Sequence, residues 1–275
     1  VTNELTSFNS DGFTTNNNNG MNENNRPYVA WNWLAANGTA SNTAGTINST
    51  VSVNTTAGFS VVGYTGTATS GVTIGHGLGV KPNMIIVKNR EPDVANWQVY
   101  HSSLGATKYL GLNENNASVT SNTRWNNTEP TTSVFTLGSS GDVVGDSSGE
   151  TFIAYCFAEK QGYSKFGNYV GNGSTDGTFI YTGFSTAFIM VKSTSSSGQW
   201  FMFDNKREGY NPENDRLIAD VGDAEADPGQ TDFLSNGFKM RFTSGNANGS
   251  GVSYIYMAFA ENPFVTSTGI PAPAR

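Results

Sequence analysis

The chain has 275 residues, 36% of them hydrophobic and 13% charged, with a formal net charge of −7. This length exceeds that of a typical single domain and favours two similar domains or one long all-β body. The 15 Lys and Arg residues are scattered along the chain. Because a nucleic-acid backbone needs a basic stripe, we expect no nucleic-acid partner. No apolar run approaches the roughly 20 residues that span a bilayer, so we expect no membrane insertion.

Gly, Asn, Ser and Thr dominate the polar part of the sequence, while Lys and Glu are scarce. Exposed helical faces are usually rich in Lys and Glu, whereas Thr, Val, Ile and aromatic residues favour strands. The composition therefore predicts an all-β protein. The one cysteine excludes an internal disulfide framework.

The first two segments of the chain are polar. Residues 28–33, YVAWNW, read like FIAYCF at residues 152–157. We therefore interpret residues 1–37 as the C-terminal part of a preceding, truncated repeat unit. Residues 38–57 contain few large apolar side chains, and we expect an extended polar linker or an edge strand there.

The next segment, residues 58–162, is interpreted as a first β-sandwich unit. Gly, Asn, Pro and Ser clusters separate its apolar runs, as is typical of antiparallel β-structure. The predicted strands are 59–66, 83–89, 97–103, 108–113, 133–138 and 151–159. Both faces of the last strand, TFIAYCFAE, are apolar, which predicts a central strand covered by a second sheet.

Residues 163–264 repeat this pattern and form the predicted second β-sandwich unit, followed by a C-terminal tail at 265–275. MIIVK, from Met84, aligns with FIMVK, from Phe188. Trp97 aligns with Trp200, and the phrase around Cys156 aligns with VSYIYMAFAEN around Ala258. Internal similarity fixes architecture. The predicted fold is all-β, with tandem antiparallel sandwich or jelly-roll-like units related by internal duplication.

The nucleophilic and basic side chains do not predict catalysis. Cys156 aligns with Ala258, so we interpret it as a buried small hydrophobic residue. His101 aligns with Asp204, and we expect it at an exposed strand end. His76 lies in TIGHGLGVKP, which lacks the strand-to-helix context of a phosphate-binding loop and predicts a tight turn. We expect no catalytic residues and no enzyme.

Two acidic clusters are candidate metal sites. Calcium binds six to eight oxygens from carboxylates and carbonyls. The first cluster is Asp142, Asp146 and Glu150; the second, which we favour as a calcium candidate, includes Asp220, Asp223, Glu225 and Asp227. Solvated turns are the alternative for both. A glycosidase needs two carboxylates in one cleft, and no acid pair recurs at equivalent positions of the two units.

Aromatic residues are the remaining candidates for ligand contact. Trp97 and Trp200 recur in register, which favours packing in the core. Trp125 lies among loop residues in SNTRWNNTEP, so we select Trp125, with Arg124, as the candidate for an exposed contact with glycan.

Long stretches of the chain, such as GFSVVGYTGTATSGVTIGHGLGVKPNMIIVKNR and FGNYVGNGSTDGTFIYTGF, resemble a family of uncharacterised repeat domains in marine tailed bacteriophages. The resemblance extends from Phe13 to Phe264. It implies a setting in large virion structural proteins that are often labelled tail-fibre-like. It implies no catalytic residues.

This resemblance gives the functional expectations. We expect a tail-fibre or appendage module of the virion, an extracellular particle, made in the host cytoplasm. The expected partners are other virion proteins, further copies of the chain in a homo-oligomer such as a trimer, and host surface glycan. The alternatives are a capsid decoration or head-fibre protein, a carbohydrate-binding module and, last, a polysaccharide depolymerase.

Overall fold

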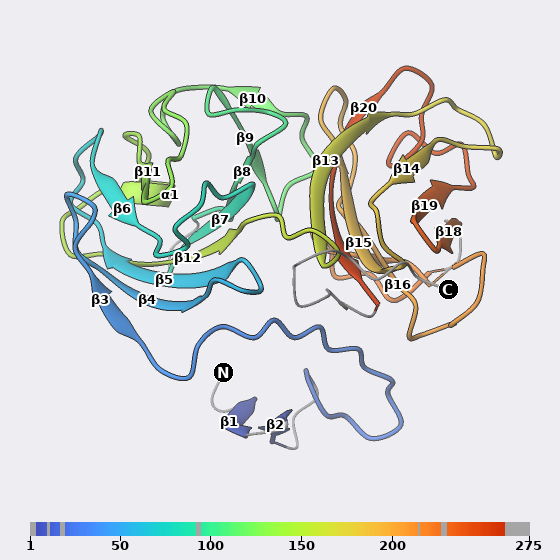
Figure 1. Ribbon diagram of the computed structural model, residues 1–275, viewed down its shortest axis with the longest axis horizontal. Coiled ribbons are helices and arrows are strands. Elements are labelled where there is room, and N and C mark those ends of the chain that lie inside the picture. Colours follow the sequence, from blue (N-terminus) through green and yellow to red (C-terminus); the bar gives the residue numbers. More distant parts are fainter. Residues whose placement is uncertain are drawn as a thin grey trace. The chain divides into compact units, whose positions relative to one another are not determined.

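The computed structural model describes residues 4–9, 12–16, 20–91, 95–213, 215–226 and 230–261. It contains two compact units, Val1–Trp33 and Leu34–Arg275. The described residues form several antiparallel sheets and one short helix, so the predicted all-β class is confirmed (Figure 1). That helix lacks the length and apolar character needed to cross a membrane, and it is the only one in these ranges.

The N-terminal unit is a hairpin followed by an irregular segment. Strands β1 (Leu5–Asn9) and β2 (Gly12–Thr15) pair antiparallel. Residues 28–33, which align in sequence with the last strand of each later repeat, do not form a strand. The strands with which they align are central ones, each held between two neighbours of its own sheet. Residues 28–33 have no such pair of neighbours within the described part of their own unit.

The second unit begins with a sandwich-like arrangement, named here the first sandwich. Its large sheet has eight strands in the order β10-β9-β8-β7-β12-β5-β4-β3. The bounds are β3 (Ala40–Asn42), β4 (Ser49–Asn54), β5 (Phe59–Thr65), β7 (Met84–Asn89), β8 (Gln98–His101), β9 (Lys108–Gly111), β10 (Val119–Thr120) and β12 (Thr151–Phe157).

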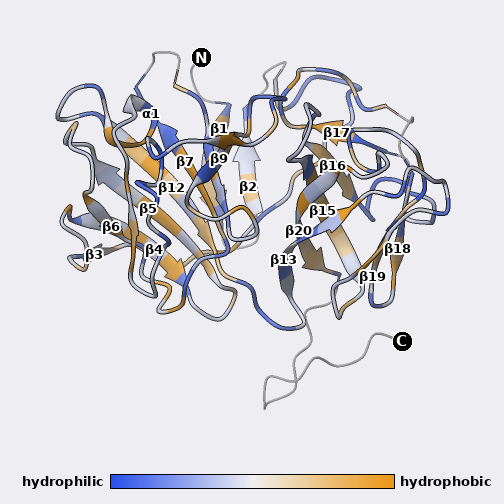
Figure 2. Ribbon diagram, turned by 90° about the horizontal axis from the view of Figure 1, so that it is seen from above, coloured by the Kyte–Doolittle hydropathy of each residue, from blue (hydrophilic) through white to orange (hydrophobic). Residues whose placement is uncertain are grey.

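A small sheet and several loops cover one face of this large sheet. The small sheet pairs β6 (Thr73–Gly75) with β11 (Val134–Thr136), and the helix α1 (Gly141–Val144) follows. Ser140 caps the helix by accepting a hydrogen bond from the Asp142 N–H. The side chains between the two layers form one buried cluster. Figure 2 shows hydrophobic residues along β5, β7 and β12, with hydrophilic loops around them.

The central strand β12 supplies much of this core. It pairs with β5 on one side and β7 on the other, as predicted for a strand with two apolar faces. Phe152, Ala154 and Cys156 point into the core and are buried. The predicted burial of Cys156 is confirmed, since the side chain has no exposed surface.

Residues 38–57 contribute the two strands at one edge of the large sheet. β4 pairs with β5 from Phe59 to Tyr64, and β3 is the outermost strand. Val51 is buried in the core and Val53 packs against it. The same segment covers β6, because the Ser49 hydroxyl donates a hydrogen bond of 2.7 Å to the Gly75 carbonyl.

The remaining strands form the second sandwich. Its large sheet has the order β13-β20-β15-β16-β17, and its small sheet has the order β14-β19-β18. The buried cluster again lies between them. The bounds are β13 (Ser164–Val170), β14 (Phe179–Tyr181), β15 (Thr186–Ser193), β16 (Phe201–Asp204), β17 (Leu217–Ile218), β18 (Thr231–Leu234), β19 (Gly237–Met240) and β20 (Ser253–Ala260).

The two sandwiches have the same strand order. In the first, β5, β12, β7, β8 and β9 are consecutive neighbours; in the second, β13, β20, β15, β16 and β17 are. The registers also agree, because Ile85 lies opposite Cys156 and Ile189 lies opposite Ala258. The sequence alignment likewise equates Ile85 with Ile189 and Cys156 with Ala258.

A buried tyrosine makes the same hydrogen bond in both sandwiches. The Tyr64 hydroxyl donates to the Val143 carbonyl and the Tyr169 hydroxyl donates to the Ala247 carbonyl, each at 2.6 Å. Each ring also stacks on an aromatic residue of the central strand, Phe152 in the first and Tyr254 in the second. The segment that precedes the last strand is thereby fastened to β5 in the first sandwich and to β13 in the second.

Candidate functional site

Aromatic side chains form a junction between the two sandwiches. Phe157 ends β12, Phe166 lies on β13 and Phe259 lies on β20. Their ring centroids are 6.1 to 6.2 Å apart, within the range of favourable aromatic contacts. Tyr163, in the short connection between β12 and β13, packs edge-on against Phe259 at 5.6 Å. The junction is therefore apolar where the chain passes from one sandwich to the other.

Hydrogen bonds extend this junction along the loop between β9 and β10. The Trp200 indole N–H donates to the Gly111 carbonyl at 2.8 Å. The Gly198 N–H donates to the Asn115 carbonyl at 2.8 Å, and the Ser118 N–H donates to the Thr194 carbonyl at 3.0 Å. Because Trp200 is 1% exposed, its side chain is held between the sandwiches.

Lys192 places a charge within the junction. Its residue is fully buried, and its ammonium donates to the carbonyls of Asn116 at 2.7 Å, Ser193 at 2.9 Å and Asn115 at 3.4 Å. Burial lowers the pKa of Lys192 to about 8, although Asp220 opposes that shift. Carbonyls from both sandwiches therefore stabilise one buried ammonium.

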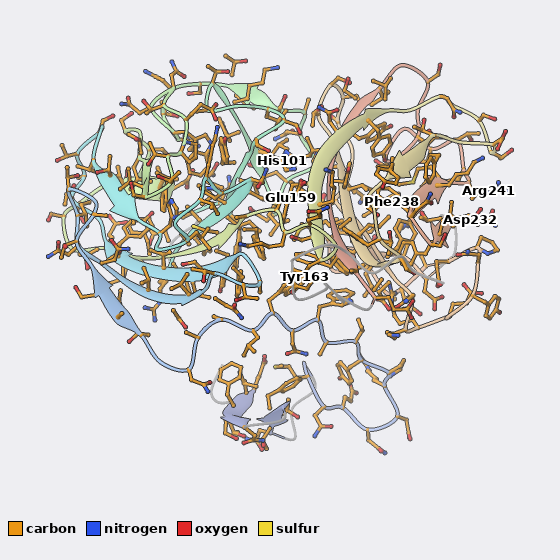
Figure 3. The ribbon with its side chains drawn as sticks, in the orientation of Figure 1. His101, Glu159, Tyr163, Asp232, Phe238 and Arg241 are labelled. Carbon is orange, nitrogen blue, oxygen red and sulfur yellow. The ribbon has the colours of Figure 1, made fainter. Side chains whose placement is uncertain are left out.

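His101 crosses the junction from the first sandwich. Its Nδ1 accepts a hydrogen bond from the Ser103 N–H, so Nε2 carries the proton and donates to the Tyr256 carbonyl at 3.2 Å. The ring is 1% exposed, and burial lowers its pKa to about 4. The expectation that His101 lies at an exposed strand end is wrong, because the face of β8 that carries His101 packs against the second sandwich. Figure 3 shows His101 beside β13, and its ring centroid lies 6.4 Å from that of Phe166.

The expected exposure of Trp125 is also wrong. Its side chain is 2% exposed and packs edge-on against Tyr100 in the core of the first sandwich. Arg124 lies over the ring of Tyr109 at 4.5 Å and pairs with Asp142 at 2.9 Å. Both side chains are thus used inside the fold. The loop composition around Trp125 hid this, because an indole can be buried even when its neighbours in sequence are polar.

The second acidic cluster is spread over different contacts. Asp220 accepts a hydrogen bond from the Trp200 backbone N–H at 2.9 Å, and Glu225 pairs with Arg207. The charge of Asp223 opposes the lowering of the Arg216 pKa that burial causes. Asp227 lies outside the described residues. Over those residues, no group of three or more acidic, His or Cys side chains is placed to hold a metal ion.

The first acidic cluster is used to fasten loops. Asp142 pairs with Arg124 and accepts a hydrogen bond from the Gln98 amide at 2.9 Å. Glu150 accepts from the backbone N–H groups of Asp146 and Ser147 and from the Asn89 amide. These hydrogen bonds, that from the Ser147 N–H first, lower the pKa of Glu150. The carboxylates of Asp142 and Glu150 are thus both engaged in contacts within the fold.

Cys156 and His76 are both held in the core. Burial raises the pKa of the Cys156 thiol, so the thiolate is strongly disfavoured. His76 has no exposed surface, and its Nδ1 accepts a hydrogen bond from the Leu78 N–H. Gly77 and Gly79 follow with positive φ values of 75° and 72°. These two glycines form the predicted turn, because other residues rarely adopt that conformation.

One family model matches residues 1–263 of the chain. The chain belongs to the family described as Domain of unknown function (DUF7483). The match covers the N-terminal unit and both sandwiches. None of the curated proteins and none of the solved structures matches the chain.

In this DUF7483 member, a pocket of about 410 Å3 opens beside the junction. It is lined by residues of the β12–β13 connection, the start of β13 and the end of β14, among them Glu159, Ser164, Lys165, Tyr181, Thr182 and Gly183. Lys165 pairs with Glu159 at 2.9 Å, and Tyr181 is 64% exposed. Figure 3 labels Glu159 and Tyr163 on the β12–β13 connection, next to β13.

Sequence reasoning missed the junction and the pocket. One usable signal for the junction was Lys192, which follows four apolar residues in the strand FIMVK. A lysine within a strand that is buried on both faces needs oxygen partners. For the pocket the signal was Tyr181, an aromatic residue at a strand end where the first sandwich has Gly75.

Proposed function

We propose that the chain is a non-enzymatic structural protein of a bacteriophage virion, a module of a tail fibre or similar appendage. It would be made in the host cytoplasm and act on the extracellular particle. The resemblance of its long sequence stretches to repeat domains of marine tailed phages supports this setting. A virion must survive outside the cell, and compact β-modules with Gly- and Asn-rich loops suit that demand.

The observation that carries the structural role is the buried junction. Trp200, Lys192 and His101 are each nearly or fully buried, and each bonds to a carbonyl across the junction. Two domains joined by a flexible linker would leave such groups in water. Joined as they are, the two sandwiches would act as one spacer element.

A non-enzymatic role is supported by the placement of the reactive side chains. The thiol of Cys156 and the ring of His76 lie in the core, and His101 lies in the junction. A nucleophile or general base has to reach its substrate. None of these three groups is placed to do so.

We further propose that the two sandwiches arose by internal duplication and that the protein assembles as a homo-oligomer such as a trimer. The matching strand order and the two equivalent tyrosine hydrogen bonds support the duplication. A surface with few charges suits lateral packing of copies, because it limits electrostatic repulsion. Host surface glycan and other virion proteins would be the further partners.

Electron microscopy of virions labelled with an antibody against the chain tests the proposal. Label on thin appendages is the expected result. Label spread over the capsid shell would overturn the appendage role in favour of capsid decoration or a head fibre. Particles without label, in a lysate that contains the protein, would overturn the virion role altogether. An antibody against a known shell protein provides the control for particle integrity.

A further inference from the structure

The two sandwiches differ at one equivalent place. In the first, the space between the start of β5 and the end of β6 is filled by β4, whose Val51 and Val53 lie against the turn at Gly77. A side chain in place of Gly75 would collide with Asn42. The segment that precedes β5 therefore plugs this end of the first sandwich.

Among the residues that the structure describes, the second sandwich has no such plug. Its β13 corresponds to β5 but is the outermost described strand of its sheet. Only residues 158–163 separate β12 from β13, too few to supply another strand and its turn. The pocket of about 410 Å3 lies where the plug would be. Registers and turns equate the residues of the first sandwich with those of the second as Ser60 with Lys165, Gly75 with Tyr181, His76 with Thr182, and Gly77 with Gly183.

The free edge of β13 carries groups that discourage pairing with another strand. Tyr163 and Gly171 hydrogen-bond towards β20, and in an antiparallel pair every second residue does so. The N–H groups of residues 164, 166 and 168 therefore point away from β20. The Glu159 carboxylate accepts the Phe166 N–H at 3.4 Å and also pairs with Lys165. In the first sandwich the corresponding N–H, that of Val61, faces β4. Charged side chains at an edge discourage pairing with another strand. A small polar ligand therefore fits this site better than a peptide strand.

We propose that this pocket binds a neutral saccharide of one or two rings. Its volume lies within the range of about 300–1,000 Å3 that is typical of small-molecule sites. Glu159 and Lys165 neutralise each other, so the pocket favours hydroxyl groups over a charged ligand. Carboxylate oxygens accept, and an ammonium donates, hydrogen bonds to hydroxyls.

Tyr181 provides the apolar part of the site. Its ring is 64% exposed although it lies beside a pocket. The C–H face of a pyranose ring is apolar and packs on the face of an aromatic ring, while the hydroxyls at its rim reach polar neighbours. Thr182 and Ser164 complete the same wall, where the Thr182 hydroxyl donates to the Phe184 carbonyl and the Ser164 hydroxyl accepts the Lys160 N–H, so Glu159 and Lys165 are the polar groups left to meet the ligand. Stacking and hydrogen bonding together define the class of ligand.

This inference deepens the adhesive part of the proposed function and rests on it for its biological meaning. The binding test uses purified chain, whereas the location test uses virions. A failure to bind sugar would leave an appendage role standing, and label on the capsid shell would leave sugar binding standing.

Saturation-transfer NMR on the full chain tests the site with glucose, galactose, mannose, N-acetylglucosamine, maltose, cellobiose and lactose as probes. We expect transfer to at least one of them. Tyr181→Gly, which installs the residue of the first sandwich, should weaken that probe at least tenfold. Lys165→Ser, chosen on the same basis, should also weaken it. Tyr210→Gly removes another tyrosine, 66% exposed, on a different loop and should leave binding unchanged.

Three outcomes would overturn the proposal. The first is that none of the probes binds the wild-type chain. The second is that a bound probe keeps its affinity in Tyr181→Gly while thermal unfolding shows that variant to be folded. The third is that a synthetic peptide of residues 46–56, which contains β4, binds and is blocked by Asn168→Pro at the edge while the sugars do not bind. That third result would identify the site as a strand acceptor.

Discussion

The two sandwiches share a strand order and differ in what packs against them. Trp97 and Trp200 occupy equivalent positions, and each backbone N–H is capped by the side chain of an equivalent residue, Asn113 or Asp220. Trp97 is half-buried and stacks on Tyr155, whereas Trp200 is enclosed by the other sandwich. The same local structure thus produces a surface in one place and a buried contact in the other.

The lysines that follow the MIIV and FIMV runs show the same difference, with similar local structure but different surroundings in the two sandwiches. Lys88 donates to the carbonyl of the next residue, Asn89, and Lys192 donates likewise to Ser193. Lys88 completes its hydrogen bonds with Ala95 from its own sandwich. Lys192 instead uses Asn115 and Asn116 of the other sandwich. Two similar sequence runs thus place their lysines differently, and Lys192 joins the two sandwiches because carbonyls of the first one are within reach.

The largest expected effect is the unequal cost of removing the two tryptophans. Trp200→Ala should lower the free energy of unfolding by about 3–5 kcal/mol, because it empties a buried site. Trp97→Ala should lower it by only about 1–2 kcal/mol, because part of that indole already faces water. Urea unfolding followed by fluorescence measures both. Equal losses would show that the difference in burial has no energetic consequence.

Acid should weaken the junction through His101. Burial lowers its pKa to about 4 in the folded chain, against about 6.5 for a solvent-exposed histidine. The unfolded chain therefore binds more protons below pH 6.5, and stability falls as the pH drops from 6.5 towards 4. At pH 5 this amounts to about 2 kcal/mol relative to pH 7.5.

The variant His101→Gln separates the contribution of His101 to the pH dependence of stability from the contributions of the other titrating groups. Urea unfolding at pH 7.5 and pH 5 should show a smaller loss on acidification in the variant than in the wild type. His76, whose pKa burial also lowers, is retained in both proteins and acts in the same direction. An identical pH dependence in the two proteins would contradict the assignment to His101.

Removing the shared tyrosine hydroxyl should cost the two sandwiches alike. Tyr64→Phe and Tyr169→Phe each leave one buried carbonyl without its donor, which costs about 1–2 kcal/mol. Thermal unfolding of both variants measures the effect. A loss in only one variant would show that the helix α1 at Val143 and the loop at Ala247 are fastened differently despite their matching hydrogen bonds.

Cys156→Ala should have the smallest effect. The equivalent position already holds Ala258, and the change removes a single sulfur atom from the core. We expect a loss of about 1 kcal/mol or less and no change in oligomeric state. Calorimetry and light scattering measure the two quantities. A loss of several kcal/mol would show that the two cores are packed differently around this position.

Much of the fold could be predicted from the sequence. Every strand predicted between Phe59 and Glu159 is present, because alternating apolar residues between Gly and Asn clusters are a strong local signal. The short strands β6 and β10 and the helix α1 were missed. Each has four residues or fewer, too few to show a period.

The candidate sites were predicted less well, for a physical reason. Burial of Trp125 and His101 depends on which distant surface packs against them, and neighbouring residues in the sequence do not encode that. Trp125 looked exposed because Asn, Thr and Arg surround it in the chain. His101 aligns with Asp204, which pairs with Arg207 at 2.8 Å. The equivalent positions of the two sandwiches therefore contact different partners.

The position of the first and last strands of the second sandwich's large sheet has a mechanical consequence. Ser164 at the start of β13 lies opposite Phe259 near the end of β20. The chain therefore enters this sheet and completes its last strand at the same end. Tension along the chain would unzip these pairs one at a time instead of shearing the whole ladder at once. In the proposed appendage, load would be borne best across contacts between sheets, and the junction at Trp200 is one of these.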